Sequence, residues 1–262
     1  MASILLDTIG GFNAYVESMK RESVPIEFTL VQFSSIGFQK SCVAQPIGSV
    51  PELNVDNYRP EGGTPLIEAS YKTIQAVAES LAKRQDKPKV IVCIQTDGEE
   101  NASDQRVMSE NKDESGRPIP LYSWRSLKKL VESKIAEGWQ FNFLGTGIDA
   151  YAQASSMGIP TGATIAASMD AASTRASYNA MGASSMRYAR GLASDTSFLS
   201  SETVAAGDLY RDKYTNQAPQ GAVPGAPTVR SPSFPPGLSG LNQLSLTPIA
   251  KAPASGMGDV SL

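Results

Sequence analysis

A short apolar segment that ends in an acidic turn is the feature that most constrains the fold. Residues 90–94 are apolar at every position, and the sequence TDGEEN follows at 96–101. Strands that are apolar at consecutive positions are typical of parallel sheets with helices on both faces. The segment therefore predicts a buried strand of an α/β sheet, after which the chain turns sharply.

The rest of the first 193 residues alternates between helical and extended patterns. Apolar spacing and helix-start signals predict helices at 5–19, 64–81, 127–135, from about 149, and up to about 193. β-Branched and aromatic residues predict strands at 26–33, 38–47, 139–145 and 163–166. The first two of these strands form a predicted hairpin, and a polar insertion covers 109–118. This alternation predicts a three-layer, Rossmann-like α/β fold with a mostly parallel sheet and helices on both faces.

We expect one domain followed by a tail. The predicted domain covers residues 1–195, and a connecting segment covers 196–214. From 215 to 262 the composition shifts to Pro, Gly, Ala and Ser with few charges. Such a segment cannot bury enough apolar surface to offset its conformational entropy, so disorder is predicted there.

Composition excludes several classes of function. The chain has no histidine, which excludes histidine general bases, Ser-His-Asp triads and zinc sites that use imidazole. The net charge of -3 gives no reason to expect nucleic acid as a partner. The N-terminus lacks signal-peptide features and no segment is apolar over the length of a bilayer, so we expect no membrane partner and a cytoplasmic location. Cys42 and Cys93 are predicted to be structural.

Two loops beside the predicted sheet could hold a ligand. EGGTPL occupies 61–66, and TDGEEN places Asp97 directly after the most buried strand. Ligands of open α/β sheets bind at the carboxyl ends of the strands, where these loops are expected. Thr64 followed by Pro65 is also an ordinary helix start with a threonine N-cap, and Asp97-Gly98 is also an ordinary turn. The presence of both loops at one sheet edge favours a binding site.

The loop sequences resemble a known family. GGTPL and IQTDGEEN resemble the second and third segments of the metal-ion-dependent adhesion site of von Willebrand factor A domains. DTIGGFNAYVES and EGWQFNFLGTGIDAYAQASSMGI resemble a bacterial and phage subgroup of that family, in which case the location would be the host cytoplasm. The resemblance implies a Mg²⁺ or Mn²⁺ ion with Thr64 as a direct ligand and Asp97 as a direct or water-mediated ligand. It also implies a protein partner whose acidic side chain completes the cation's shell.

The sequence departs from that family at its start. No DxSxS segment precedes the first helix, whereas in the family this segment and its strand come directly before it. The resemblance therefore implies that the first, central strand and about half of the cation's protein ligands are missing, and we expect weak metal binding and reduced stability. In order of preference, the explanations are a start assigned too late, a degenerate gene fragment, and a segment supplied by another chain.

Two other functions compete with a cation-dependent binding module. One is a metal-independent structural or assembly protein. The other is a nucleotide-binding enzyme, because GTGIDA at 145–150 formally fits G-x-G-x-x-[GA]. No acidic residue closes a following strand where a dinucleotide site requires one, so Gly145 and Gly147 are predicted to form a tight turn instead. Glu99, Glu100 and Asp104 are interpreted as a solvated acidic loop, and no enzymatic activity is expected.

Overall fold

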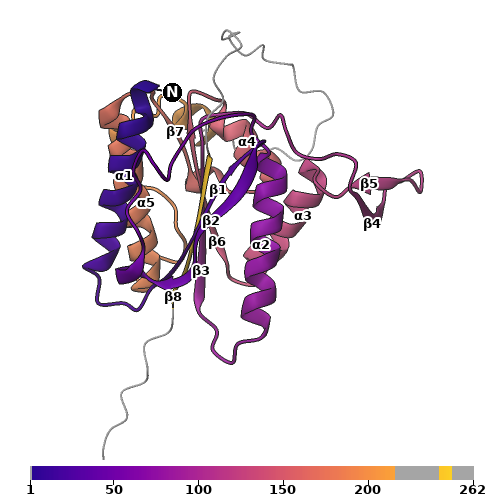
Figure 1. The fold of residues 1–262 in the computed structure, drawn as a ribbon, viewed down its shortest axis with the longest axis horizontal. Helices are drawn as coiled ribbons and strands as arrows, with labels where there is room; N and C mark the ends of the chain where they lie inside the picture. Colours follow the sequence, from indigo (N-terminus) through magenta and orange to yellow (C-terminus); the bar gives the residue numbers. More distant parts are fainter. Residues whose placement is uncertain (1, 216–241, 250–262) are drawn as a thin grey trace, which may run out of the picture.

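The protein folds into a mixed α/β structure with three layers, as a computed structural model that describes residues 2–215 and 242–249 shows (Figure 1). The helices are α1 (Ala2–Lys20), α2 (Leu66–Ala82), α3 (Trp124–Ala136), α4 (Ala150–Met157), α5 (Ala171–Ala189), α6 (Ser200–Ala205) and α7 (Arg211–Thr215). The strands are β1 (Glu27–Ser34), β2 (Gly37–Pro46), β3 (Lys89–Thr96), β4 (Met108–Lys112), β5 (Pro118–Pro120), β6 (Gln140–Thr146), β7 (Thr164–Ala167) and β8 (Asn242–Ile249). Short 3₁₀ turns cover Ile47–Ser49 and Thr161–Ala163. The α/β class expected from the sequence is confirmed.

The main sheet contains both strand directions. Its order is β2-β1-β8-β3-β6-β7. The β3–β6 and β6–β7 pairs are parallel, whereas β1–β2, β1–β8 and β3–β8 are antiparallel. The sheet is thus mixed rather than mostly parallel, because the β1–β2 hairpin and β8 both add antiparallel neighbours.

The strand β8 occupies the centre of the sheet, where the family resemblance implied a missing strand. It pairs with residues 29–33 of β1 on one side and with residues 89–95 of β3 on the other. The structure therefore differs from the expectation of an empty central position, and it differs from the expectation of disorder over 215–262 at residues 242–249. The remaining parts of that predicted tail, 216–241 and 250–262, lie outside the described residues.

Helices cover both faces of the sheet. Figure 1 shows α1 and α5 on one face and α2, α3 and α4 on the other. Two apolar cores result, one under α1 and α5 and one under α2–α4. Burial of each large apolar side chain contributes roughly 1.5–3 kcal/mol, so the two cores supply most of the stabilisation.

Glycine allows α1 and α5 to approach closely. A Cβ atom on Gly11 would lie 2.4 Å from Cδ2 of Tyr178, so any side chain at position 11 would displace the buried tyrosine ring. The apolar spacing predicted helix α1, but the contact that uses Gly11 depends on a residue far along the chain.

The turn from β6 into α4 confirms the structural interpretation of GTGIDA. Gly147 has φ 68°, in the left-handed region that favours glycine. A Cβ atom on Gly145 would lie 2.5 Å from Cβ of Ala150. The Asp149 side chain caps α4 by accepting a hydrogen bond from Ala152 N at 3.0 Å. The two glycines form the predicted tight turn.

The segment 196–214, expected to be a connection, packs against the domain. Asp208 is buried and accepts hydrogen bonds from the Tyr151 hydroxyl at 2.7 Å and from Ala166 N at 3.0 Å. Arg187 of α5 pairs with Glu202 of α6 at 2.6 Å. These contacts tie α6 and α7 to α4, α5 and β7.

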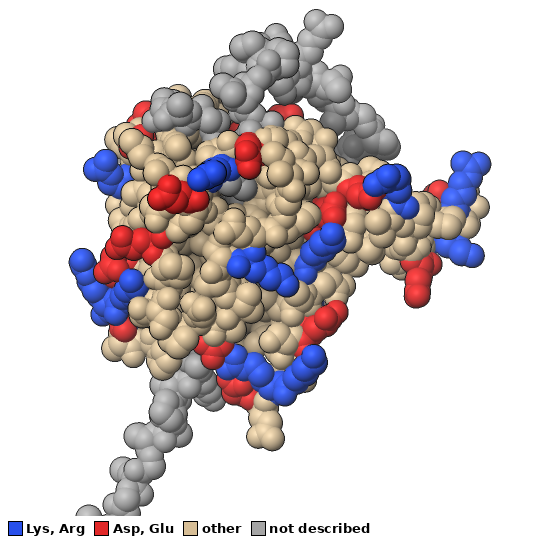
Figure 2. Space-filling model, in the orientation of Figure 1, with Lys and Arg blue, Asp and Glu red and all other residues tan. Residues whose placement is uncertain are grey.

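The surface carries mixed charge and a projecting hairpin. On the face drawn in Figure 2, basic and acidic side chains are interspersed rather than gathered by sign. The predicted polar insertion forms the hairpin of β4 and β5, which extends from the body (Figure 1). Within the described part of the chain, no helix has the length and apolarity needed to cross a bilayer. Cys42 and Cys93 are both buried and neither is in a disulfide, as expected.

Candidate functional site

The two loops singled out in the sequence lie side by side at the end of β3. Thr64 N donates a hydrogen bond to Oδ1 of Asn101 at 2.7 Å, and Asn101 N donates to the Thr64 carbonyl at 3.1 Å. Gly63 N donates to Oγ of Ser35 at 2.7 Å, which attaches the first loop to the β1–β2 turn as well. The structure thus brings the EGGTPL and TDGEEN loops together, as the sequence predicted.

Close backbone contact explains the glycines in both loops. A Cβ atom on Gly98 would lie 2.4 Å from Oγ1 of Thr64, and one on Gly63 would lie 2.8 Å from Oδ1 of Asn101. Neither position can hold a larger residue unless its neighbour moves. The Thr64 hydroxyl therefore lies directly against the turn that follows Asp97.

The Thr64 side chain does not cap a helix. Helix α2 begins at Leu66 with Pro65 before it, and no side chain caps it from that position. The expected N-cap role of Thr64 is therefore wrong. Thr64 is fully buried, and no described residue forms a hydrogen bond with its Oγ1. A buried hydroxyl without a partner costs about 1–3 kcal/mol.

Glu100 caps α2 in place of Thr64. Its Oε2 accepts hydrogen bonds from Ile67 N and from Oγ of Ser103, both at 2.7 Å. Its Oε1 accepts from the backbone N of Ala102 at 3.0 Å and of Ser103 at 2.9 Å. A carboxylate at a helix N-terminus also interacts favourably with the helix dipole. The interpretation of Glu100 as merely solvated is wrong, because it joins the second loop to α2.

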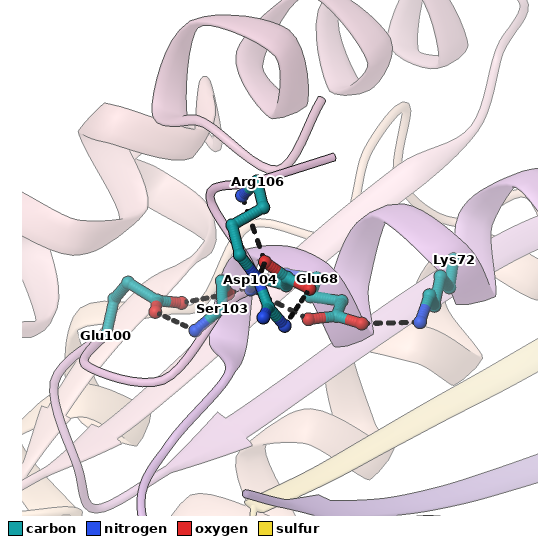
Figure 3. Close-up of polar contacts among 6 residues, drawn as sticks. All are labelled: Glu68, Lys72, Glu100, Ser103, Asp104 and Arg106. Carbon is teal, nitrogen blue, oxygen red and sulfur yellow. Dashed lines mark hydrogen bonds and ion pairs between the residues drawn. The ribbon is translucent and has the colours of Figure 1, made fainter. Parts of the chain in front are cut away.

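The neighbouring acidic residues are paired with basic ones (Figure 3). Glu68 forms an ion pair with Lys72 and accepts a hydrogen bond from Asp104 N at 3.0 Å. Arg106 Nε donates to Oδ1 of Asp104 at 2.8 Å, and this hydrogen bond lowers the pKa of Asp104 from 3.8 to about 2. Glu68 in turn raises the pKa of Lys72. These carboxylates stabilise the loop and are not arranged as an acid/base pair.

Asp97 lines a small pocket at the carboxyl ends of β3 and β6. The pocket is lined by Ile4 and Thr8 of α1, Thr174 of α5, Tyr58 of the loop before α2, and Gln95, Thr96, Asp97 and Thr146 at the strand ends. It leaves about 10 Å³ for a water-sized molecule, which is about the space that one water needs. Burial, reinforced by the charge of Asp97, raises the pKa of Tyr58, so this phenol stays protonated. Sequence reasoning missed the threonine hydroxyls around Asp97, because they come from separate elements.

The available oxygens fit a cation only in part. Thr64 supplies a hydroxyl and Asp97 a carboxylate, the hard ligands that Mg²⁺ prefers, and Mg²⁺ keeps several waters in protein sites. Thr64 is not among the residues that line the Asp97 pocket. Within residues 2–215 and 242–249, no group of three or more His, Cys, Asp or Glu is placed to hold a metal. The geometry supports at most an incomplete site.

Comparisons with known proteins identify no relative of this chain. No protein-family model, no curated protein and no solved structure matches it. The family resemblance of the two loops therefore stays a prediction, and the function is inferred from the geometry of the site.

Proposed function

We propose that the chain is a protein-binding module of the von Willebrand factor A type with an incomplete divalent-cation site at Thr64 and Asp97. One observation carries the proposal: the Thr64 hydroxyl is fully buried, lacks a hydrogen-bond partner among the described residues, and lies against the turn that follows Asp97. A Mg²⁺ or Mn²⁺ ion there would satisfy this hydroxyl and offer an open position to an acidic side chain of a protein partner.

The chain's own residues preorganise this edge. Asn101 forms hydrogen bonds with both the backbone N–H and the carbonyl of Thr64, and these bonds fix the backbone of Thr64. Gly98 allows the turn to approach the hydroxyl, and Glu100 holds the adjacent N-terminus of α2. With only two protein ligands, cation affinity should be low, because most of the coordination shell would remain water.

A second function is favoured by the direct bonds between the loops. The hydrogen bonds of Asn101 and Glu100 hold both loops without any metal ion. A module whose site is fixed in this way can act as a metal-independent structural or assembly protein. The nucleotide-binding alternative is not supported by the β6–α4 turn, because Met169 lies over Gly147, where a Cβ atom would be 2.6 Å from its Sδ.

Thermal unfolding of the full chain in EDTA, Mg²⁺ and Mn²⁺ separates the two functions. The matched variants are Thr64→Val, which removes the hydroxyl, and Thr64→Ser, which retains it. If the cation site exists, Mn²⁺ raises the melting temperature of the native chain and of Thr64→Ser but not of Thr64→Val. A ligand at 100 times its Kd stabilises by about 2.7 kcal/mol, so for millimolar affinity the melts extend to about 100 mM Mn²⁺.

Two other outcomes would argue against cation binding at Thr64. An identical Mn²⁺ shift in Thr64→Val would mean that the ion binds elsewhere. No shift in the native chain at about 100 mM Mn²⁺ would contradict the cation proposal and favour the metal-independent function. In that case binding to acidic peptides should be unchanged by EDTA.

A further inference from the structure

The central strand of the sheet comes from the far end of the chain. β8 runs antiparallel to β3 from Lys89↔Ile249 to Gln95↔Gln243. It also runs antiparallel to β1 from Thr29↔Leu246 to Phe33↔Asn242. Without β8, the facing edges of β1 and β3 would leave their backbone N–H and carbonyl groups without strand partners. The space between β1 and β3, here called the strand slot, therefore requires an extended segment.

The strand slot is largely apolar on both faces, with Gln32 of β1 and Gln95 of β3 at one end. On the α1 and α5 side it is bordered by Leu30 of β1 and by Ile91 and Cys93 of β3, which belong to one core. On the α2 side it is bordered by Val31 and by other apolar residues of β3, which belong to the second core. A segment that suits this environment is apolar at consecutive positions, as β3 itself is.

The sequence of β8 does not have that pattern. NQLSLTPI alternates polar and apolar residues over most of its length, which is typical of a strand with one solvated face. Its register pairs Ser245 with Leu30 and Cys93, and Thr247 with Ile91. At Ser245 and Thr247 the register therefore combines a polar residue type with partners from an apolar core, whereas Gln243 pairs with Gln32 and Gln95, which are also polar. Apolar residues at these positions would contribute more free energy of burial.

Pro248 lies near the end of β8, beyond the residues that pair with β1. It pairs with Val90 in the ladder with β3. Proline has no backbone N–H and is confined in sheets to edge strands, strand starts or bulges. With β3 on one side only, Pro248 occupies an edge position that proline tolerates.

We propose that the strand slot is a peptide-binding groove and that β8 is its exchangeable intramolecular occupant. The external partner is an extended protein segment of about seven residues, apolar at consecutive positions, that replaces β8 between β1 and β3 by strand addition. The groove accepts this segment because both of its faces are largely apolar and both of its edges need hydrogen-bond partners. This proposal does not depend on the cation site.

Covalent attachment explains why a mismatched strand can occupy the groove. A tethered segment competes at an effective concentration on the order of 1 mM, so β8 needs only modest intrinsic affinity. A free peptide with the β8 sequence must reach similar concentrations to compete. A peptide with a better apolar pattern should compete at about tenfold lower concentration or less, because each additional buried apolar side chain adds binding free energy.

Disulfide trapping in the full chain tests the exchange. Ser245→Cys in a Cys42→Ala background places a thiol opposite Cys93, its register partner, within the Cα spacing that a disulfide requires. Leu246→Cys in the same background is the control, because its register partner in β3 is Val92 rather than Cys93. Cross-linking under mild oxidation is followed on non-reducing gels. Competitor peptides carry either NQLSLTPI or the same sequence with valine at the positions of Ser245, Thr247 and Pro248.

We expect an intramolecular cross-link with Ser245→Cys and none with Leu246→Cys. The valine peptide should slow cross-linking at about tenfold lower concentration than NQLSLTPI. No cross-link with Ser245→Cys, or a cross-linked dimer, would overturn the assignment of β8 as the intramolecular occupant. Unchanged cross-linking at millimolar valine peptide would overturn exchange and identify β8 as a permanent strand. Equal potency of the two peptides would overturn the preference for an apolar segment.

Discussion

Replacing Thr64 with valine should stabilise the chain when no metal ion is present. The Thr64 side chain is 0% exposed, and no described residue forms a hydrogen bond with its Oγ1. Removing a buried hydroxyl without a partner recovers about 1–3 kcal/mol of desolvation, and valine keeps the branched shape. The added methyl lies against Gly98, and overpacking of this kind offsets part of the gain. We therefore expect a net gain of about 1 kcal/mol, which raises the melting temperature by about 2–4 °C.

Urea unfolding and thermal melts in EDTA measure this effect. Thr64→Ser provides the comparison, because it keeps the hydroxyl, loses a methyl and should be less stable by about 1 kcal/mol. In Mn²⁺ the order should change, since only variants that retain the hydroxyl gain stability from the ion. A Thr64→Val protein that is less stable than the native chain in EDTA would refute the reasoning, because the hydroxyl would then have a stabilising partner.

Three further predictions concern the same edge of the sheet. Gly98→Ala should destabilise by about 1–3 kcal/mol, because its Cβ would lie 2.4 Å from Oγ1 of Thr64; a double-mutant cycle with Thr64→Ala should show that removing the hydroxyl relieves much of this cost. Glu100→Ala should cost about 1–3 kcal/mol in urea unfolding and accelerate hydrogen exchange in the first turn of α2, whereas Glu100→Gln should cost less. Arg106→Gln should raise the pKa of Asp104 from about 2 toward 3.8, measured by NMR titration. Because the pKa of Asp104 is lowered in the folded state, its pair with Arg106 stabilises the fold above pH 4, and this contribution is lost as the pH falls through about 2. If Asp104 kept its native pKa in Arg106→Gln, Arg106 would not be the cause of the lowered pKa.

Local patterns were sufficient for the elements that depend on local chemistry. The apolar run at 90–94 predicted the buried strand β3, and helical spacing predicted α1. Asp149 and the two glycines before it predicted the turn into α4, because capping and positive φ depend on residues close in sequence. The meeting of the Thr64 and Asp97 loops was predictable because both follow from the sheet's topology.

Local sequence patterns did not predict the features that depend on residues far apart in the chain. Thr64-Pro65 has the sequence of an ordinary helix start, yet the cap of α2 is Glu100, whose carboxylate accepts from Ile67 N across 33 positions. The Glu100 carboxylate occupies the helix N-terminus, and Thr64 does not cap it but is fully buried. The hydroxyls of Thr8, Thr146 and Thr174 around Asp97 were missed for the same reason, because no spacing in the sequence connects them.

The position of β8 could not be derived from composition. A Pro- and Gly-rich composition predicts disorder because such a segment has little apolar surface to bury. Strand formation also depends on whether neighbouring strands offer free backbone hydrogen-bonding groups. The facing edges of β1 and β3 supply such partners for residues 242–249. Strand propensity depends strongly on context, and here the context comes from residues more than 140 positions away.

The strand slot and the candidate cation site meet at one edge, and this contact allows a final test. Gln243 pairs with Gln95, two positions before Asp97, so β8 begins beside the turn that could hold the ion. If the occupant of the slot alters this edge, Mn²⁺ affinity should differ between the oxidised and reduced forms of the Ser245→Cys protein. Thermodynamic linkage then requires Mn²⁺ to change the population of inserted β8 by the same factor. Equal Mn²⁺ affinity in both forms would show that the two features are independent, since a disulfide that fixes β8 cannot leave a coupled site unchanged.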